Sequence, residues 1–342
     1  MSDRPGWLRV ASRPWFQGLV GAAVVAVAFA WALPRFADYA EVGDQLRSLD
    51  RGVVPLLVLV AAVNLVAPSL SQLAALPGLR LRHAVAVDWV TSTVTNLVPG
   101  GSAIAVGLTW SMYRSLSLAT GAIARSVVVT GVWDALVKLG TPLPAVLWLA
   151  TQRPVGPVLI QAAAIGGVLF VVSVGLGAAV LTGPGAATAG GRLLDRLPLL
   201  GRGWPARLDA MRSDTIGLLG ERGSALTLAT VAGHANLYLL LVVCLRAVGI
   251  ERDVLGLAPI LAAFAFGRLV TALPLTPGGL GVLEVGLVGA LVAAGDAAEA
   301  SVVAGVLLFR FCSFALPLPL GLASWLWWTQ SVGGLSARPC RA

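Results

Sequence analysis

The sequence contains few of the residues on which soluble enzymes and metal proteins depend. Only 12 % of its 342 residues are charged, and it has three cysteines and two histidines. Two cysteines, Cys244 and Cys312, lie in apolar runs and Cys340 lies near the end, so their spacing fits neither a disulfide framework nor a zinc site. Catalytic patterns such as a Ser-His-Asp elbow, HExxH or a GxxxxGK[ST] phosphate loop are absent. We therefore expect a protein that is not an enzyme and uses no metal and no cofactor.

Apolar residues make up 57 % of the chain and the mean hydropathy is +0.87, which is too high for a soluble domain of this length. A helix of about 20 apolar residues crosses a hydrocarbon core of roughly 30 Å. The sequence predicts an all-α polytopic membrane protein with about six full spans, which are expected at residues 15–33, 53–76, 119–150, 156–181, 225–249 and 300–328.

The net charge of +8 does not indicate nucleic-acid binding, because the basic residues flank the apolar spans instead of gathering on a soluble face. Arginine and lysine in short loops mark the cytoplasmic side of a membrane protein. We expect a multi-pass protein of the plasma membrane, with residues 1–14 and the tail 331–342 in the cytoplasm. Residues 183–223 are expected to form a cytoplasmic loop, whose arginines are Arg192, Arg196, Arg202, Arg207, Arg212 and Arg222.

Two further apolar segments, residues 84–113 and 255–295, are interrupted by Pro-Gly-Gly corners. In the first segment the arms hold about 15 and 12 residues, or roughly 22 and 18 Å of helix, so neither arm spans a bilayer alone. Each segment is expected to form a broken or re-entrant helical hairpin. The corners are Pro99-Gly100-Gly101 and Pro277-Gly278-Gly279.

The two hairpins occupy equivalent positions in two similar units, residues 53–150 and 225–328, and the loop charges place the corners on opposite sides. This pattern predicts one transmembrane domain, residues 15–330, built as an inverted-topology repeat with discontinuous helices near the bilayer midplane. Irregular backbone at that depth must be buried in protein or line a wet cavity. Backbone amides near Gly278, Gly279 and Gly281 could then face an anionic group such as a lipid phosphate. Alternatively, the glycines only allow tight helix packing.

Ionisable residues inside apolar segments are the second functional signal, because they usually face a bundle interior and pair with one another. Asp134 and Lys138 stand at i and i+4, which favours a structural ion pair. Glu284 lies two helical turns beyond the second corner, and we expect Arg268 or Arg310 as its partner, for function or as a purely structural pair. The remaining residues of this kind are Asp88, Arg125 and, as a weaker case, His234. Polar contacts between helices are the expected role of Asn64, Asn96, His234 and Asn236.

The run Leu273-Pro274-Leu275-Thr276-Pro277-Gly278-Gly279-Leu280-Gly281-Val282-Leu283-Glu284, with the later Leu307-Leu308-Phe309-Arg310, resembles the transmembrane, flippase-like region of lysylphosphatidylglycerol synthases. The run Thr95-Asn96-Leu97-Val98-Pro99-Gly100-Gly101 is similar to an N-terminal element of that family. The resemblance implies a membrane domain that moves a lipid or lipid-linked group between leaflets. It carries the binding role over to Pro277, Gly278, Gly279, Gly281, Glu284 and Arg310, and more weakly to Asn96, Pro99, Gly100 and Gly101.

Two features depart from that family. Thr130 and Gly131 stand where relatives often carry a Glu-Arg pair, and the cytosolic aminoacyltransferase domain of the bifunctional members has no counterpart in the sequence. We therefore expect a stand-alone member that does not transfer lysine to lipid.

Three functions fit the sequence. The leading hypothesis is a lipid translocase in which an anionic head group enters a cavity between the hairpins and meets Arg268 or Arg310, while Glu284 balances these charges in the empty cavity. The second is a membrane accessory subunit whose segment 183–223 docks an enzyme of cell-envelope synthesis. The third is a proton-coupled carrier of a small solute, with Glu284 as the titrating group.

Overall fold

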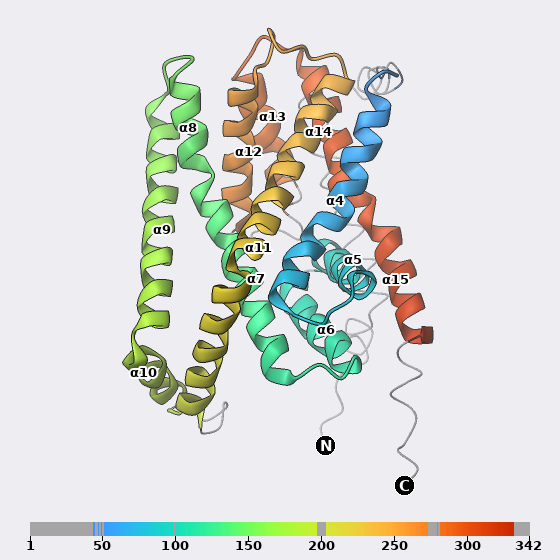
Figure 1. The fold of residues 1–342 in the computed structure, drawn as a ribbon. Coiled ribbons are helices and arrows are strands. Elements are labelled where there is room, and N and C mark those ends of the chain that lie inside the picture. Colours follow the sequence, from blue (N-terminus) through green and yellow to red (C-terminus); the bar gives the residue numbers. More distant parts are fainter. Residues whose placement is uncertain are drawn as a thin grey trace, which may run out of the picture.

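A computed structural model of the chain describes residues 44, 47, 49, 51–98, 100–196, 203–272, 279 and 281–331. Within these residues the regular structure is entirely helical, and the helices form an elongated bundle (Figure 1). The prediction of an all-α polytopic membrane protein is confirmed. The predicted span at residues 15–33, together with Pro99, Pro277 and Gly278, lies outside the described part of the chain.

The first repeat begins with a long helix, continues with a hairpin and ends with two helices in line. Its elements are α4 (Val54–Ala75), α5 (Leu81–Leu97), α6 (Gly101–Ser115), α7 (Thr120–Gly140) and α8 (Pro142–Ala150). Helices α9 (Pro157–Thr182) and α10 (Pro184–Leu194) then lead to the second repeat. That repeat contains α11 (Trp204–Ala247), α12 (Leu257–Ala272), α13 (Val282–Val292), α14 (Glu299–Arg310), the π-helical turn η3 (Phe311–Ala315) and α15 (Pro317–Ser331).

Four of the predicted spans correspond to helices that are long and apolar enough to cross a membrane: α4, α9, α11 and the continuous run from α14 to α15. The predicted span at residues 119–150 is not one of them, because it divides into α7 and α8 at Thr141. Proline at position 142 has no N–H for the helical ladder and is accommodated best in the first turn of a new helix.

The expected loop at residues 183–223 is largely helical. Helix α10 covers its first part, and α11 begins at Trp204 and continues without a break to Ala247. At 1.5 Å per residue, the 44 residues of α11 extend about 66 Å, roughly twice the thickness of a hydrocarbon core. The change from charged to apolar residues near position 223 therefore marks a change of environment along one helix, where the sequence analysis expected a loop to end.

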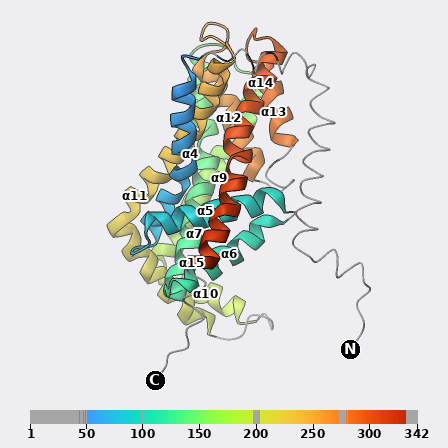
Figure 2. The ribbon, with the colours of Figure 1, turned by 90° about the vertical axis from the view of Figure 1, so that its right-hand side faces the viewer.

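Both hairpins are present, and each returning helix begins at a glycine with positive φ. Gly100 (φ +70°) precedes α6, and Gly281 (φ +77°) precedes α13. Only glycine adopts this conformation without a steric penalty from a Cβ atom, so the corners follow directly from their composition. The α5–α6 and α12–α13 hairpins lie toward opposite ends of the bundle (Figures 1 and 2). This placement agrees with the predicted inverted repeat.

The two repeats interlock through their hairpins. Helix α5 of the first repeat packs on α15 of the second, and α12 of the second repeat packs on α8 of the first. The opening helices of the two repeats, α4 and α11, pack along one another. In each repeat, therefore, the first helix of the hairpin packs on the last helix of the other repeat. Through these two contacts the halves form one folding unit.

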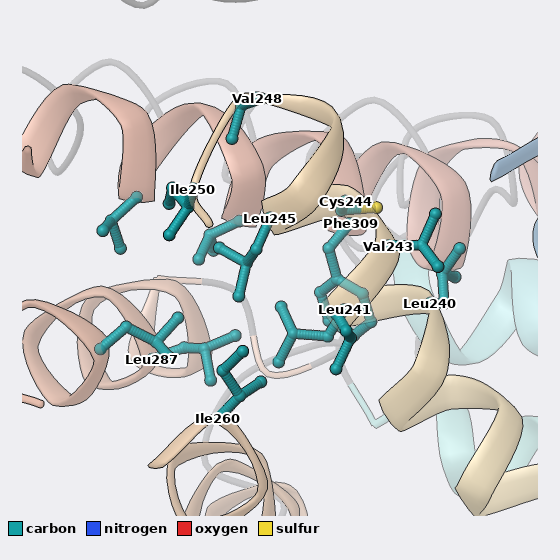
Figure 3. Close-up of a cluster of buried hydrophobic side chains, with 14 of the residues drawn as sticks. Leu240, Leu241, Val243, Cys244, Leu245, Val248, Ile250, Ile260, Leu287 and Phe309 are labelled. Carbon is teal, nitrogen blue, oxygen red and sulfur yellow. The ribbon is translucent and has the colours of Figure 1, made fainter. Parts of the chain in front are cut away.

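A large apolar core stabilises the second repeat and anchors it to α4. In Figure 3, Leu241 and Leu245 of α11 lie beside Ile260 of α12, Leu287 of α13 and Phe309 of α14. Glycine at position 305 permits the closest of these approaches, because a Cβ atom there would collide with Leu245 of α11. The polar groups described below are therefore held by tightly packed, apolar helices.

Replacing Gly321 by alanine is expected to destabilise the contact between the repeats. A Cβ atom at this position in α15 would overlap Thr93 Oγ1 and the carbonyl oxygen of Trp89, both in α5. Overpacking of this kind typically costs about 1–3 kcal/mol. Thermal unfolding in detergent should show a lower midpoint for Gly321→Ala, whereas Gly175→Ala in α9 should not lower it, because nothing lies within 4 Å of the added methyl group. Equal midpoints for the two variants would contradict the assigned contact.

Candidate functional site

Two groups of charged side chains lie between the repeats. The first group joins Asp134 and Lys138 of α7 to His234 of α11 and Arg268 of α12. The second group is the pair Glu284 of α13 and Arg310 of α14. Helix α13 packs on both α12 and α14, so Arg268 of the first group and the residues of the second group lie on neighbouring helices. We call these six residues the charged interior.

Asp134 is the centre of the first group. Its carboxylate lies 2.6 Å from Lys138 Nζ, as their i, i+4 spacing predicts, and 3.4 Å from His234 Nε2. Arg268 Nη2 lies 3.9 Å from the same carboxylate. The Asp134 side chain is 43 % exposed, whereas those of its three partners are 14–20 % exposed. Asp134 is therefore the most accessible member of this group, and the three basic side chains beside it are largely covered.

Arg268 was expected as a possible partner of Glu284, and the structure places it beside Asp134 instead. Its Nε atom is buried and forms no hydrogen bond among the described residues, and its nearest ion-pair distance is long. The neighbouring Gly267 explains how this arginine comes to lie between the repeats, since a Cβ atom there would collide with Leu283 of α13. The close approach of α12 and α13 leaves Arg268 directed toward α7.

Glu284 and Arg310 form the tightest ion pair of the charged interior. The Arg310 Nε atom donates to Glu284 Oε1 at 2.6 Å, and the two side chains are 9 % and 12 % exposed. The guanidinium also lies over the ring of Phe314 at 4.5 Å, a distance at which a cation and an aromatic face attract one another. The other carboxylate oxygen, Oε2, is buried and has no hydrogen-bond partner among the described residues.

The helix that carries Arg310 changes its winding directly after this residue. Residues 311–315 form a π-helical turn, and α15 begins at Pro317. A π turn widens the helix and frequently occurs at functional sites. Here it leaves the Arg310 side chain beside Phe314 and lets one long span bend between its two halves. Apart from the proline that follows it, no residue pattern indicated this turn.

The first hairpin contributes less to the charged interior than predicted. Among the hydrogen bonds and ion pairs of the described residues, none joins Asn96, Gly100 or Gly101 to the charged interior. The Gly101 amide donates to the carbonyl oxygen of Val98 at 2.8 Å and so is occupied within the turn. Gly101 is buried, and a Cβ atom there would collide with the Val94 carbonyl, which indicates a packing role. Binding roles for Gly279 and Gly281 stay predictions.

His234 is the residue that the sequence analysis undervalued. We expected a polar contact between helices, and the structure places its ring beside Asp134 of α7, at the centre of the first group. The contact between His234 and Asp134 could not be predicted from local spacing, because the two residues are about one hundred positions apart in the sequence. Asn236, two residues further along α11, forms the expected contact between helices, because its side-chain amide donates to the Val60 carbonyl of α4 at 3.2 Å.

The charged interior holds one positive charge in excess when His234 is neutral. Lys138, Arg268 and Arg310 oppose the two carboxylates, Asp134 and Glu284. In the described part of the chain, no cluster of three or more His, Cys, Asp or Glu side chains could hold a metal ion. A surplus cation held between apolar helices favours an anionic ligand, because burial of an uncompensated charge is costly until an opposite charge arrives.

The fold and its charged interior define the chain as a polytopic α-helical membrane protein made of two interlocked, inverted halves. A family model for the lysylphosphatidylglycerol synthase TM region matches residues 18–321, and the chain belongs to that family. No curated protein matches the sequence significantly. The match covers both repeats, so the resemblance carried by the two glycine corners extends to the whole bundle.

Proposed function

We propose that the chain is a lipid translocase that moves a phospholipid or lipid-linked anionic head group between leaflets without catalysing a reaction. The observation that carries this proposal is the charged interior, which combines side chains of both repeats and has one cation in excess. A solvated head group could exchange water for Arg268 and Lys138 there, while its acyl chains stay among the apolar helices. Family membership supports the same function.

The proposed pathway uses the two halves in turn. The hairpins enter the bundle from opposite ends, so movement of one hairpin would open the charged interior to one leaflet at a time (Figure 2). In transporters with inverted repeats, alternating access arises by movement of one unit against the other around a fixed midplane site. Arg268 and Arg310 lie on the second repeat and Asp134 on the first, so such movement would change the distances between them.

We propose the plasma membrane as the location, with both termini in the cytoplasm. Helix α10, the start of α11 and the α6–α7 connection lie at one end of the bundle, and the α11–α12 and α13–α14 connections lie at the other (Figure 1). The first end carries Arg114, Arg192, Arg196 and Arg207 beside Asp195 and Asp209, whereas the second carries Arg252 beside Glu251, Asp253, Asp296 and Glu299. The positive-inside rule then orients the first end toward the cytoplasm.

Reconstitution with acyl-labelled fluorescent lipids tests this function. Vesicles that contain the chain and one labelled lipid are treated with a membrane-impermeant quencher, and the accessible fraction is followed over time. We expect anionic lipids to become accessible at least tenfold faster than in protein-free vesicles, and faster than lipids with a zwitterionic head group, because the charged interior has an excess cation. Equal rates for all head groups and for empty vesicles would overturn the proposal.

The same experiment separates translocation from the alternative role as an accessory subunit. That role is favoured by the exposed arginines of α10 and the first half of α11. Replacing Arg192 and Arg196 by glutamine should leave translocation in vesicles unchanged if the charged interior is the site. If this double variant instead lost an activity that the charged-interior variants retained, the segment would be the functional surface.

A further inference from the structure

A carboxyl group in the first hairpin lacks the cationic partners that the other intramembrane carboxylates have. Asp88 lies in the middle of α5, and its Oδ1 atom accepts a hydrogen bond from Gln72 Nε2 of α4 at the long distance of 3.4 Å. Asp134 and Glu284, by contrast, each lie 2.6 Å from a basic group. Among the described residues, no ion pair within 4.0 Å involves Asp88.

The helices packed against α5 supply no charge that could compensate Asp88. The main contacts of α5 with described helices are those with α4, α6 and α15, and neither α4 nor α15 contains an ionisable acid or base within its bounds. Helix α6 carries Arg114, whose Nη1 atom donates to Thr120 Oγ1 at 2.9 Å. On α5 itself, Arg82 is exposed near the first turn. The ring of His83 packs against those of Trp327 and Trp328.

Asp88 does have a chain of hydrogen-bonding groups beside it. The buried Tyr113 of α6 donates its hydroxyl proton to Gln72 Oε1, and the amide of Gln72 donates in turn to Asp88. These bonds fix the side-chain amide of Gln72 so that its NH₂ group faces the carboxyl. One long, neutral hydrogen bond stabilises a carboxylate far less than the several strong bonds or the ion pair that a charged group requires in an apolar bundle. A bound proton removes this cost, because a carboxylic acid is neutral.

We propose that Asp88 is a proton-binding site and that proton exchange at this carboxyl couples lipid movement to the transmembrane proton gradient. The coupling part rests on the proposed translocase function. A proton from one side joins the carboxylate to give the acid while α5 is packed against α4 and α6. When movement of the hairpin exposes Asp88 to water, the same proton leaves to the other side and the carboxylate is restored. Helix α5 can transmit such a change to the second repeat, because it lies across α15 and packs on it (Figure 2).

Infrared difference spectroscopy of the full chain in lipid tests the site itself. Raising the pH should remove the carbonyl band of a protonated carboxyl group in the wild type, and this change should be absent in Asp88→Asn. The exposed control Asp253→Asn should retain the change. Tyr113→Phe should move the transition without abolishing it, because it frees Gln72 and leaves the carboxyl in place. An identical titration in wild type and Asp88→Asn would overturn the proposal.

Translocation under an imposed pH gradient tests the coupling. In vesicles with the membrane potential clamped, a proton gradient should change the rate of lipid movement severalfold in the wild type and leave the rate of Asp88→Asn unchanged. A sodium gradient at equal pH should have no effect on either protein. If sodium alone changes the rate, or if Asp88→Asn still responds to the proton gradient, the coupling role is wrong.

The two measurements separate failure of this inference from failure of the proposed function. Vesicles without lipid movement but with an infrared transition that depends on Asp88 would reject the translocase and retain the proton site. Lipid movement without any dependence on Asp88 in either measurement would retain the translocase and reject the proton site.

Discussion

Replacing Arg310 by alanine is expected to reduce lipid translocation to the rate of protein-free vesicles and to destabilise the folded chain by about 3–5 kcal/mol. The Arg310 Nε atom donates to Glu284 Oε1 at 2.6 Å, and both side chains are largely buried. Removing the guanidinium leaves the Glu284 carboxylate in an apolar bundle with its second oxygen already lacking a hydrogen bond. Unfolding in mixed micelles measures the stability, and quenching of a labelled anionic lipid measures the translocation.

A double variant distinguishes the structural part of this effect from the functional part. Glu284→Gln combined with Arg310→Met removes both charges and keeps an apolar stem near Phe314, which the guanidinium contacts in the wild type. Replacing both partners of a buried ion pair often restores the stability lost by removing one. We expect the double variant to regain most of the stability but not the translocation. If it translocates anionic lipid at the wild-type rate, the pair only supports the fold.

The parts of this site that could be predicted from the sequence depend on local rules. Glycines after a proline predicted the two hairpin corners, because positive φ at Gly100 and Gly281 follows from the residue type. Spacing on one helix predicted the contact between Asp134 and Lys138. The position of Glu284 in an apolar segment just beyond the corner led to the prediction that Arg268 or Arg310 is its partner, and Arg310 is the one that the structure shows.

The parts that could not be predicted depend on which helices lie beside one another. Nothing local indicates that Arg268 faces Asp134 of the other repeat instead of Glu284, which is closer in sequence. The same holds for His234, and for the packing of α5 on α15, which is more than two hundred residues away in the chain. The length of α11 escaped prediction for another reason, since a charged surface helix and a polar loop have similar composition, and only tertiary contacts with α10 distinguish them.

The interlocked repeats explain how the folded chain remains stable although the charged interior buries ionised groups, which costs free energy. Each hairpin packs on the final helix of the other repeat, so the apolar contacts that hold the halves together also surround the charged groups. Burial of apolar surface contributes little between helices in lipid, and close packing carries more of the stability there. Close contacts such as those of Gly321 with α5 and Gly305 with α11 therefore offset the free-energy cost of two buried atoms, Arg268 Nε and Glu284 Oε2. Neither atom has a hydrogen-bond partner among the described residues.

Arg268→Gln is expected to separate function from stability most sharply. Its guanidinium lies 3.9 Å from Asp134, and its Nε atom has no hydrogen-bond partner among the described residues, so the fold gains little from the charge. We expect the unfolding midpoint to change only slightly, because Asp134 keeps Lys138 at 2.6 Å as its partner and burial of the poorly paired guanidinium is itself costly.

Translocation of anionic lipid by Arg268→Gln should fall at least tenfold, because the charged interior loses its excess cation, and the preference over zwitterionic lipid should disappear. Arg268→Lys, which keeps the charge, should recover part of both. The matched control Arg252→Gln removes the same charge from an exposed position and should leave rate and preference unchanged. Among the described cations of the charged interior, Arg268 lies farthest from its carboxylate, so it is the one most available to a ligand. If Arg268→Gln keeps the wild-type preference for anionic lipid, the charged interior is not the source of the selectivity.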